Sequence, residues 1–403
     1  MNKITQVPQN GINVGAKYFG YLLFTLFIVL FPLGQLLRIE SQIYGVYVVI
    51  HPIDLVTLFS LPYLFLVKKE YRFKYLGTVL FILTSSWIFA LGKFKFSESL
   101  TGLMYLIRII SYYSFALCVN YIAKGKKIRK LILGALLTSI TAFMLYGFYQ
   151  YIFFYDLRDL FYSGWDDHYF RFTSTLLDPG YTAVVLITGL VILLKTKIKS
   201  VALLKYVLIP LYLLSIILTF SRAGYITLLF ALLYTYKRHF KKIVFIFLVL
   251  LSIVLIVPKP RSSGVELLRT FSIFSRIQNY SETIGIFSSN PLFGVGFNNI
   301  CQYRLKYLNT NSAVSHSCSG SDSSLLLLLA TSGLVGLMTF SYGIYNACRT
   351  ISNNRYGNLL FIIFALVLVS SFFNNSLFYN FIMGILAILL GLTKRRTIPG
   401  STK

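Results

Sequence analysis

The sequence has few charged residues and few cysteines. Charged residues make up 12% of its 403 residues, whereas an ordinary soluble domain carries about 25%. A soluble chain of this length would not have enough polar side chains to cover its surface. The four cysteines are too few for a disulfide scaffold to be the basis of the fold. These shortages exclude the common classes of soluble protein.

Familiar catalytic motifs are absent from the sequence as well. It contains no Walker phosphate loop, no dinucleotide-binding glycine fingerprint and no His-Glu-x-x-His pair. The four histidines are scattered, and no two have a metal-ligand spacing. Asp166 and Asp167 are adjacent and either supply oxygen ligands to a metal or form a solvated loop tip, which we favour. We therefore expect a protein without a metal or another cofactor.

The sequence is instead rich in apolar residues, which make up 56% of the chain. A helix needs about 20 such residues to cross the hydrocarbon of a bilayer, and somewhat fewer where flanking side chains reach the interface. This criterion predicts an all-α polytopic membrane protein of about twelve transmembrane helices, with residues 1–403 forming one integral membrane domain. The predicted spans are 18–38, 53–67, 75–91, 100–122, 131–154, 179–194, 201–220, 223–236, 243–258, 323–347, 359–373 and 378–392.

The formal net charge of +26 sets the predicted orientation. Lysines and arginines form short clusters between apolar runs, which indicates topology signals and argues against a nucleic-acid-binding groove. With the N-terminus inside, most of the 38 basic residues and only one of the 12 acids, Glu70, fall on the cytoplasmic side. We therefore predict a multi-pass protein of the bacterial inner membrane with both termini in the cytoplasm. The first span lacks a small-x-small site after it, so we expect a retained anchor.

Two predicted outer loops, 155–178 and 259–322, are too long to be simple connections. In the second, Leu267, Leu268, Phe271 and Phe274 recur at helical spacing, whereas Arg269 and Arg276 share the opposite face. This pattern predicts an amphipathic helix lying on the outer surface. Its arginines either face a cavity or meet lipid phosphates. Aromatic residues of the first loop either stack on sugar rings or belong to the interfacial belt.

Arginines near the predicted outer face are the main candidates for chemistry. They are Arg171 before Asp178, Arg222 in a tight hairpin, and Arg276 on the amphipathic helix. An arginine near the bilayer is costly unless an anion pairs with it. That anion is either an outer acid of the protein or a bound phosphate, which a planar guanidinium contacts in a bidentate manner. Arg108, inside the fourth span, is expected to lie against protein or a wet cavity.

Four segments together resemble a family of bacterial envelope proteins. Residues 290–297 (NPLFGVGF) resemble the "NPLxGxGF" segment of the O-antigen ligase/polymerase superfamily. Residues 322–325 (DSSL) and 330–336 (ATSGLVG) are similar to its downstream signature, in which a polar pair opens a helix. The Ser-Arg-Ala-Gly hairpin at 221–224 and the segment 171–179 are similar to two further landmarks. The motifs cover roughly residues 165–340, and the predicted span count agrees with the family.

The sequence departs from the ligase branch of this superfamily at one position. The ligases carry His-Asn where this chain has Asp322-Ser323. His316 lies six residues earlier and would sit in the loop, not at the helix start. The acid therefore makes the chain look more like the polymerase branch (Wzy), and the ligase that transfers polymer to lipid A-core is the alternative.

The resemblance implies a metal-independent, GT-C-like membrane glycosyltransferase of lipopolysaccharide and polysaccharide biosynthesis. Its substrate would be undecaprenyl-diphosphate-linked oligosaccharide at the outer face of the inner membrane. Arg222 and Arg276 would stabilise the leaving diphosphate. Asp322 would be the catalytic base or a helix N-cap. The expected substrate contacts are Arg171, Arg269, Asp178 and His316.

Membrane lipids, a chain-length regulator and a flippase are the expected partners of such an enzyme. A lipid-linked oligosaccharide flippase is also the alternative function from a different class, because twelve spans with both ends inside suit a transporter too. The absence of a clear internal repeat and the concentration of polar residues outside favour surface chemistry. Cys301 and Cys318 share the second outer loop and are expected either to form a disulfide or to remain free thiols.

Overall fold

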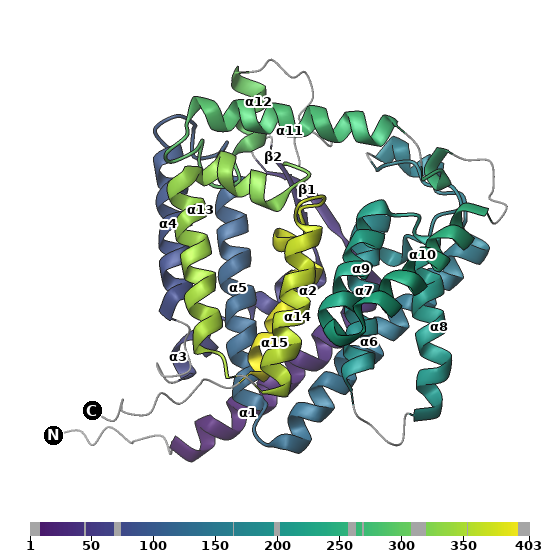
Figure 1. Cartoon of the computed structure of the whole chain (residues 1–403). Helices are drawn as coiled ribbons and strands as arrows, with labels where there is room; N and C mark the ends of the chain where they lie inside the picture. Colours follow the sequence, from purple (N-terminus) through teal and green to yellow (C-terminus); the bar gives the residue numbers. More distant parts are fainter. Residues whose placement is uncertain are drawn as a thin grey trace.

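A computed structural model of the chain shows a bundle of roughly parallel helices with a smaller helical layer across one end (Figure 1). It describes residues 9–43, 46–67, 74–163, 165–196, 202–256, 263–267, 270–307, 320–352 and 354–393. The bundle helices are α1 (Gln9–Leu30), α2 (Pro52–Leu58), α3 (Tyr63–Leu66), α4 (Lys74–Ala90), α5 (Leu100–Ile122), α6 (Lys126–Phe153), α7 (Pro179–Lys195), α8 (Ala202–Leu218), α9 (Arg222–Thr235), α10 (Phe240–Ile256), α13 (Ser324–Thr350), α14 (Arg355–Ser370) and α15 (Asn380–Leu392).

The layer across the end holds two helices and a hairpin. They are α11 (Phe271–Ser289), α12 (Ile300–Tyr307) and the antiparallel pair β1 (Ile39–Ile43) and β2 (Val46–Ile50). Ile39 lies opposite Ile50 in this hairpin, which the pattern of apolar runs did not predict. Its β-branched residues favour strands over helices. Short 3₁₀ turns complete the described chain: η1 (Phe31–Leu37), η3 (Arg158–Ser163), η4 (Ser174–Leu176), η6 (Lys237–His239), η7 (Ser263–Val265) and η9 (Ser376–Phe378).

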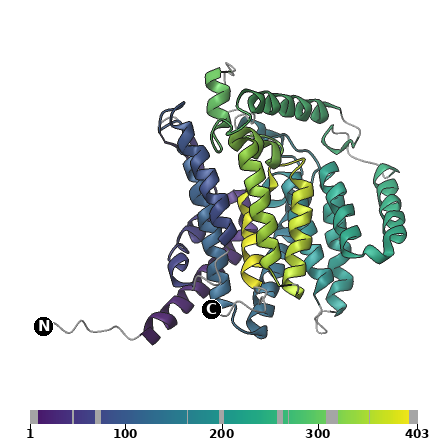
Figure 2. The same ribbon diagram turned by 60° about the vertical axis from the view of Figure 1, so that its left-hand side comes forward.

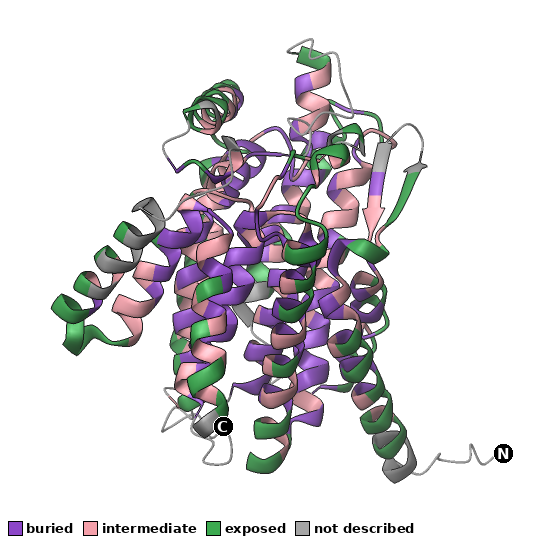
Figure 3. Cartoon of the chain, turned by 90° about the vertical axis from the view of Figure 1, so that its right-hand side faces the viewer, coloured by how far each residue is buried: buried purple, intermediate pink, exposed green. Residues whose placement is uncertain are grey.

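Length and surface identify the bundle as that of a membrane protein. Val14–Leu37, Leu100–Ile122, Lys126–Phe153 and Ser324–Thr350 are each long and apolar enough to cross a bilayer. Large apolar side chains are exposed on its outer faces, among them Phe65, Phe81, Leu131, Tyr206 and Phe245. Such an extensive apolar surface is expected where lipid is the solvent. Figure 3 shows buried residues along the middle of the bundle and exposed ones around it.

Helices occupy all twelve ranges predicted as spans, although the second range is divided between α2 and α3. The prediction of an all-α membrane protein is therefore confirmed, and the number of membrane crossings stays a prediction. The first residues of α1 and the last of α15 lie at the same end of the bundle, opposite α11 (Figure 1). Following the predicted orientation, we call the end that carries α11 the outer end.

The helix α7 forms the centre of one half of the bundle, and nearly all its residues are buried. It packs against α8 and α9, while α14 packs against α9 and α15. In the other half, α5 packs against α15, and α13 packs against α4. The outer ends of α7, α9, α13 and α15 therefore come together beneath α11 (Figures 1 and 2).

Arg108 on α5 lies against protein, as the sequence led us to expect. Its guanidinium donates to the Asp54 carboxylate at 2.8 Å and to the Val49 carbonyl at 3.1 Å. Tyr112 donates to the other Asp54 oxygen at 3.0 Å. His51, which precedes α2, completes the group through a contact of 3.4 Å with Asp54. An intramembrane charge is costly unless it is paired, and this pair joins α5 to α2.

The segment 290–296 is inserted into a kink of α13. Gly333 has φ 68° and ψ −173°, which interrupts the helix there. The amides of Val295 and Gly296 donate to the carbonyls of Ala330 and Thr331 at 3.1 and 2.9 Å. In return, the amides of residues 334 and 335 donate to the carbonyls of Pro291 and Leu292 at 2.9 and 3.2 Å. The segment 290–296 therefore supplies hydrogen-bond partners for the backbone amides and carbonyls that the kink leaves unpaired within α13. These hydrogen bonds fix the outer half of α13.

Replacing Gly333 by alanine should destabilise this junction. The Gly333 backbone lies in a region that is essentially restricted to glycine, and occupying it with another residue costs about 1–3 kcal/mol. A Cβ at this position would also overlap the Leu292 carbonyl. We expect a lower thermal unfolding temperature in detergent for the Gly333→Ala variant. The control is Gly134→Ala on α6, where a Cβ meets nothing; equal unfolding temperatures for both variants would contradict this account.

Candidate active site

The outer helix α11 presents two different faces. Ile273, Phe274 and Ile277 point away from the protein, and Phe274 is 68% exposed. Arg276 and Asn279 lie on the opposite face and contact residues at the outer ends of bundle helices. The helix is therefore amphipathic, and its polar face contacts the bundle. It lies across the outer end of the bundle (Figure 2).

The start of this helix differs from the prediction. The helix begins at Phe271, so Leu267 precedes it and instead packs with Phe220, Tyr225 and Val265 in a small apolar cluster. Apolar spacing alone extended the predicted helix too far, because packing against α9 holds Leu267 outside it. Leu268 and Arg269 fall outside the described residues, so the predicted contact of Arg269 with substrate remains a prediction.

The structure brings Arg222 and Arg276 together beneath the start of α11. Arg222 is the first residue of α9 and donates to the Leu267 carbonyl at 3.3 Å and to Ser272 Oγ at 2.6 Å. Arg276 donates to Asn374 Oδ1 at 3.4 Å, a long hydrogen bond. The two guanidinium charges lie close enough to repel each other. Two like charges held together form a natural site for an anion.

The Ser-Arg-Ala-Gly sequence explains how Arg222 is placed. Ser221 Oγ accepts a hydrogen bond from the Gly224 amide at 3.2 Å and so caps α9. A Cβ at Gly224 would crowd Ala183 of α7, so glycine permits the close packing of the two helices. The arginine between these two residues is thereby held at the outer end of α9, next to α11.

Asp322 lies at the outer end of α13 but does not cap it. The cap is Ser323, whose Oγ accepts from the Leu326 amide at 3.4 Å and donates to the Ser371 carbonyl at 2.9 Å. The Asp322 amide donates to Asn279 Oδ1 of α11 at 2.9 Å. The interpretation of Asp322 as an N-cap is therefore wrong, because the next residue occupies that position. The cap of α13 therefore does not use the Asp322 carboxylate.

Charges around Asp322 determine how readily it ionises. Burial raises the pKa of the carboxyl above its ordinary value of 3.8, because the charged form is poorly solvated. Asp166 and Asp178 raise it further by repulsion, whereas Arg276 and Arg304 lower it. The structure therefore places Asp322 within electrostatic reach of two predicted site residues, Asp178 and Arg276. A carboxyl with a raised pKa beside arginines in a partly buried position is a candidate acid or base.

Arg171 lies a little apart and is engaged with the bundle. Its side chain is 8% exposed, and it donates to the carbonyls of Thr219 and Phe220 at 3.1 and 3.4 Å, beyond the end of α8. Gln150 Oε1 accepts from the amides of Thr173 and Ser174 at 3.1 and 3.2 Å and so holds the same loop. These contacts give Arg171 a role in placing the loop, and its contact with substrate stays a prediction.

Asp178 ends that loop and caps α7. Its Oδ1 accepts a hydrogen bond from the Tyr181 amide at 2.8 Å, and Pro179 occupies the first turn. Burial raises the pKa of the Asp178 carboxyl, Asp166 adds to the rise, and Arg171 opposes it. Substrate binding by Asp178 therefore stays a prediction beside an observed structural role.

Several residues of the site were missed in the sequence. Asn279 follows Arg276 by three positions on the same helical face, so its inward placement was available from the helical period. Asn374 follows α14 in the turn Ser-Phe-Phe-Asn-Asn-Ser (371–376) and gave no signal of its own. Arg304 on α12 is fully buried, with a nitrogen 3.3 Å from Glu282 of α11. The places of Asn374 and Arg304 in the site become evident only from the three-dimensional packing around α11.

Two further predictions for this region involve residues outside the described part of the chain. His316 and Cys318 fall outside it, so the proposed contact of His316 with substrate stays a prediction. Cys301 takes part in a disulfide bond, whereas Cys118 and Cys348 are free. The disulfide that the second outer loop was expected to allow is therefore present at Cys301.

The fold and the site together define a helical membrane protein in which two arginines and a partly buried carboxylate lie beneath an outer helix. Residues 206–341 match the family model described as O-Antigen ligase (Wzy_C). This match confirms the resemblance to the O-antigen ligase/polymerase superfamily, whose members are glycosyltransferase-like enzymes. The matched segment contains Arg222, Arg276 and Asp322. No curated protein matches the chain.

Proposed function

We propose that this protein polymerises undecaprenyl-diphosphate-linked oligosaccharide repeat units into O-antigen or capsular polysaccharide. The family match supports ligase- or polymerase-type chemistry on lipid-linked oligosaccharide at a membrane. The observation that carries the proposal is the placement of Arg222, Arg276 and Asp322 around α11, where Arg222 contacts Ser272, Arg276 contacts Asn374 and the Asp322 amide contacts Asn279. In the predicted orientation, this group faces the periplasm, where the growing chain is held.

The reaction transfers a growing chain from its lipid carrier onto a new repeat unit. The bond between the anomeric carbon and the diphosphate oxygen breaks, and a bond forms to a hydroxyl of the non-reducing sugar of the new unit. Negative charge therefore builds on the departing diphosphate. Guanidiniums already positioned at that point stabilise the transition state without reorganising. Arg222 and Arg276 have this role in our proposal.

The acceptor hydroxyl loses its proton as the new bond forms. Asp322 accepts that proton in our proposal, and the amide of Asn279 keeps its backbone in place beneath α11. The identity of this residue favours polymerase over ligase, because the ligases have a histidine there. No step requires a metal, since the arginines supply the positive charge at the leaving group.

The proposal is tested with purified protein in liposomes that contain lipid-linked repeat units. A polymerase yields a ladder of products from the repeat units alone. A ligase yields a product only when lipid A-core is added, and a flippase moves the repeat unit across the bilayer without forming a bond. Products that depend on lipid A-core, or translocation alone, would contradict the proposal.

A further inference from the structure

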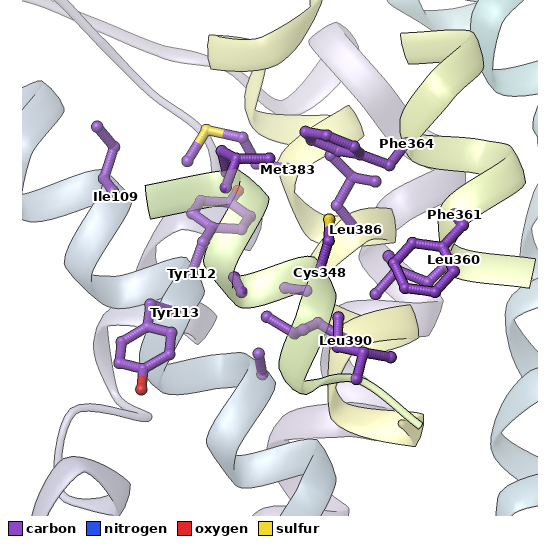
Figure 4. A pocket seen from close by; sticks show the side chains of 15 residues that line it. Ile109, Tyr112, Tyr113, Cys348, Leu360, Phe361, Phe364, Met383, Leu386 and Leu390 are labelled. Atoms are coloured by element: carbon purple, nitrogen blue, oxygen red, sulfur yellow. The ribbon is translucent and has the colours of Figure 1, made fainter. Parts of the chain in front are cut away.

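An apolar groove lies between four helices of the bundle, well below the candidate active site. Its volume is about 200 Å³, and its walls come from α5, α13, α14 and α15 (Figure 4). Small side chains leave the space, namely Ala116, Ala347 and Ala387, while Phe361 and Met383 form parts of its wall. The groove therefore has an apolar lining that suits a hydrocarbon chain.

The packing of the four helices explains why this space exists. The main partner of α13 is α4, whereas α14 packs against α9 and α15. The groove lies where α13 and α14 separate, and it is floored by the closely packed pair α5 and α15. In a bilayer, its surroundings are lipid, so its occupant is a hydrocarbon chain and not water.

Three of the helices that form the groove, α13, α14 and α15, have their outer ends beside the candidate active site. Met383 lies one turn below Asn380, where α15 begins at the outer end. The helix α13 is preceded by Asp322, and α14 is followed by Asn374, which accepts the hydrogen bond from Arg276. A diphosphate bound between the arginines would therefore place its lipid chain at the outer end of the helices that form the groove.

We propose that this groove binds the polyisoprenoid chain of the lipid-linked donor. The inference rests on the proposed function and adds a second substrate contact to it. Aliphatic and aromatic side chains line the groove, and the flexible Met383 side chain adapts to an irregular apolar chain. Lipid tails are as apolar as the groove, so the gain is packing and orientation, not removal from water. A lipid chain bound in the groove keeps the attached diphosphate in one orientation relative to the arginines.

Filling the groove should slow the reaction of a donor with a long lipid chain but not that of a donor with a short one. Ala347→Trp places an indole in the groove, and Met338→Trp places one on α13 at a position that is 61% exposed. Donors carrying undecaprenyl or a chain of two isoprene units are compared. We expect Ala347→Trp to lower kcat/KM for the undecaprenyl donor about tenfold, which corresponds to roughly 1.4 kcal/mol. Turnover of the short donor should be unchanged, and Met338→Trp should match the wild type with both donors.

The results distinguish failure of this inference from failure of the proposed function. If the wild-type protein polymerises neither donor, the proposed function is wrong. If it polymerises both but Ala347→Trp slows both equally, the groove has a structural role and the inference is overturned. An equal preference of the wild type for both donors would overturn it as well.

Binding can also be followed without catalysis, because the free thiol of Cys348 lines the groove. In a Cys118→Ser background, alkylation of Cys348 is timed in micelles that contain undecaprenyl phosphate, phospholipid or inorganic diphosphate. We expect undecaprenyl phosphate to slow the alkylation of Cys348, and phospholipid and inorganic diphosphate to leave its rate unchanged. Equal protection by phospholipid would identify a site for bilayer lipid and overturn the assignment to the donor.

Discussion

Replacing Arg276 by alanine is expected to lower the rate of polymerisation by about 10²–10³-fold, the usual effect of removing one charge-stabilising donor from an active site. Arg276 repels Arg222, attracts Asp322 and donates a long hydrogen bond to Asn374. Within the part of the chain that the structure describes, its guanidinium therefore has little fixed contact at a position where a neighbouring positive charge repels it. The developing charge of the leaving diphosphate is the partner that this placement suits. The rate is measured from the growth of the product ladder.

Lysine at this position should restore only part of the rate. A single ammonium keeps the positive charge but cannot make the paired contacts of a guanidinium with phosphate oxygens. Arg158→Ala is the matched control, because Arg158 is exposed in an outer loop and pairs with Asp156. Its rate should equal that of the wild type. Full activity of Arg276→Ala would show that this residue does not stabilise the leaving group.

Replacing Asp322 by asparagine should leave single repeat units in place of long chains. The amide cannot accept the proton of the acceptor hydroxyl, so we expect a loss of about 10²–10⁴-fold, the range of general-base catalysis. The backbone contact with Asn279 does not involve the side chain, so folding should be preserved. Thermal unfolding in detergent checks that the variant folds like the wild type.

The pH dependence follows from the raised pKa of Asp322. A base must be ionised, so activity falls as the pH drops through its pKa, and burial places this fall above the ordinary value of 3.8. Arg276 lowers the pKa of Asp322. The residual activity of Arg276→Ala should therefore fall at a higher pH than that of the wild type. An unchanged acid limb would mean that Asp322 is not the titrating base.

Two control variants separate chemistry from helix capping. Ser323→Ala removes the observed cap of α13 and should cost about 1 kcal/mol of stability, while the base is retained. Asp159→Asn removes an exposed carboxylate of the first outer loop and should change neither rate nor stability. If Ser323→Ala abolished polymerisation in folded protein while Asp322→Asn did not, the base assignment would move away from Asp322.

The helical ranges could be predicted from the sequence because a bilayer imposes a simple requirement on length and polarity. Helices occupy each predicted range, including 378–392, which is short for a span. The β1–β2 hairpin was missed because the search for apolar runs passes over short strands. The kink at Gly333 was also missed, since it depends on hydrogen bonds from a segment some forty residues earlier.

The site was partly predictable for a related reason. Arginine near a membrane is costly enough to draw attention, which singled out Arg222 and Arg276, and the structure brings them together. Family resemblance singled out Asp322 but left its role open between base and cap. The sequence could not separate these roles, because Asp322 and Ser323 are both good capping residues, and only the geometry shows that Ser323 caps α13.

The most direct test of the account is the product ladder made by purified wild-type protein from lipid-linked repeat units, with a chelator present and no lipid A-core. We predict a ladder of growing polymer under these conditions, and only single repeat units from the Asp322→Asn variant. A wild-type protein that makes no ladder, or an Asp322→Asn variant that polymerises at the wild-type rate, would contradict the account.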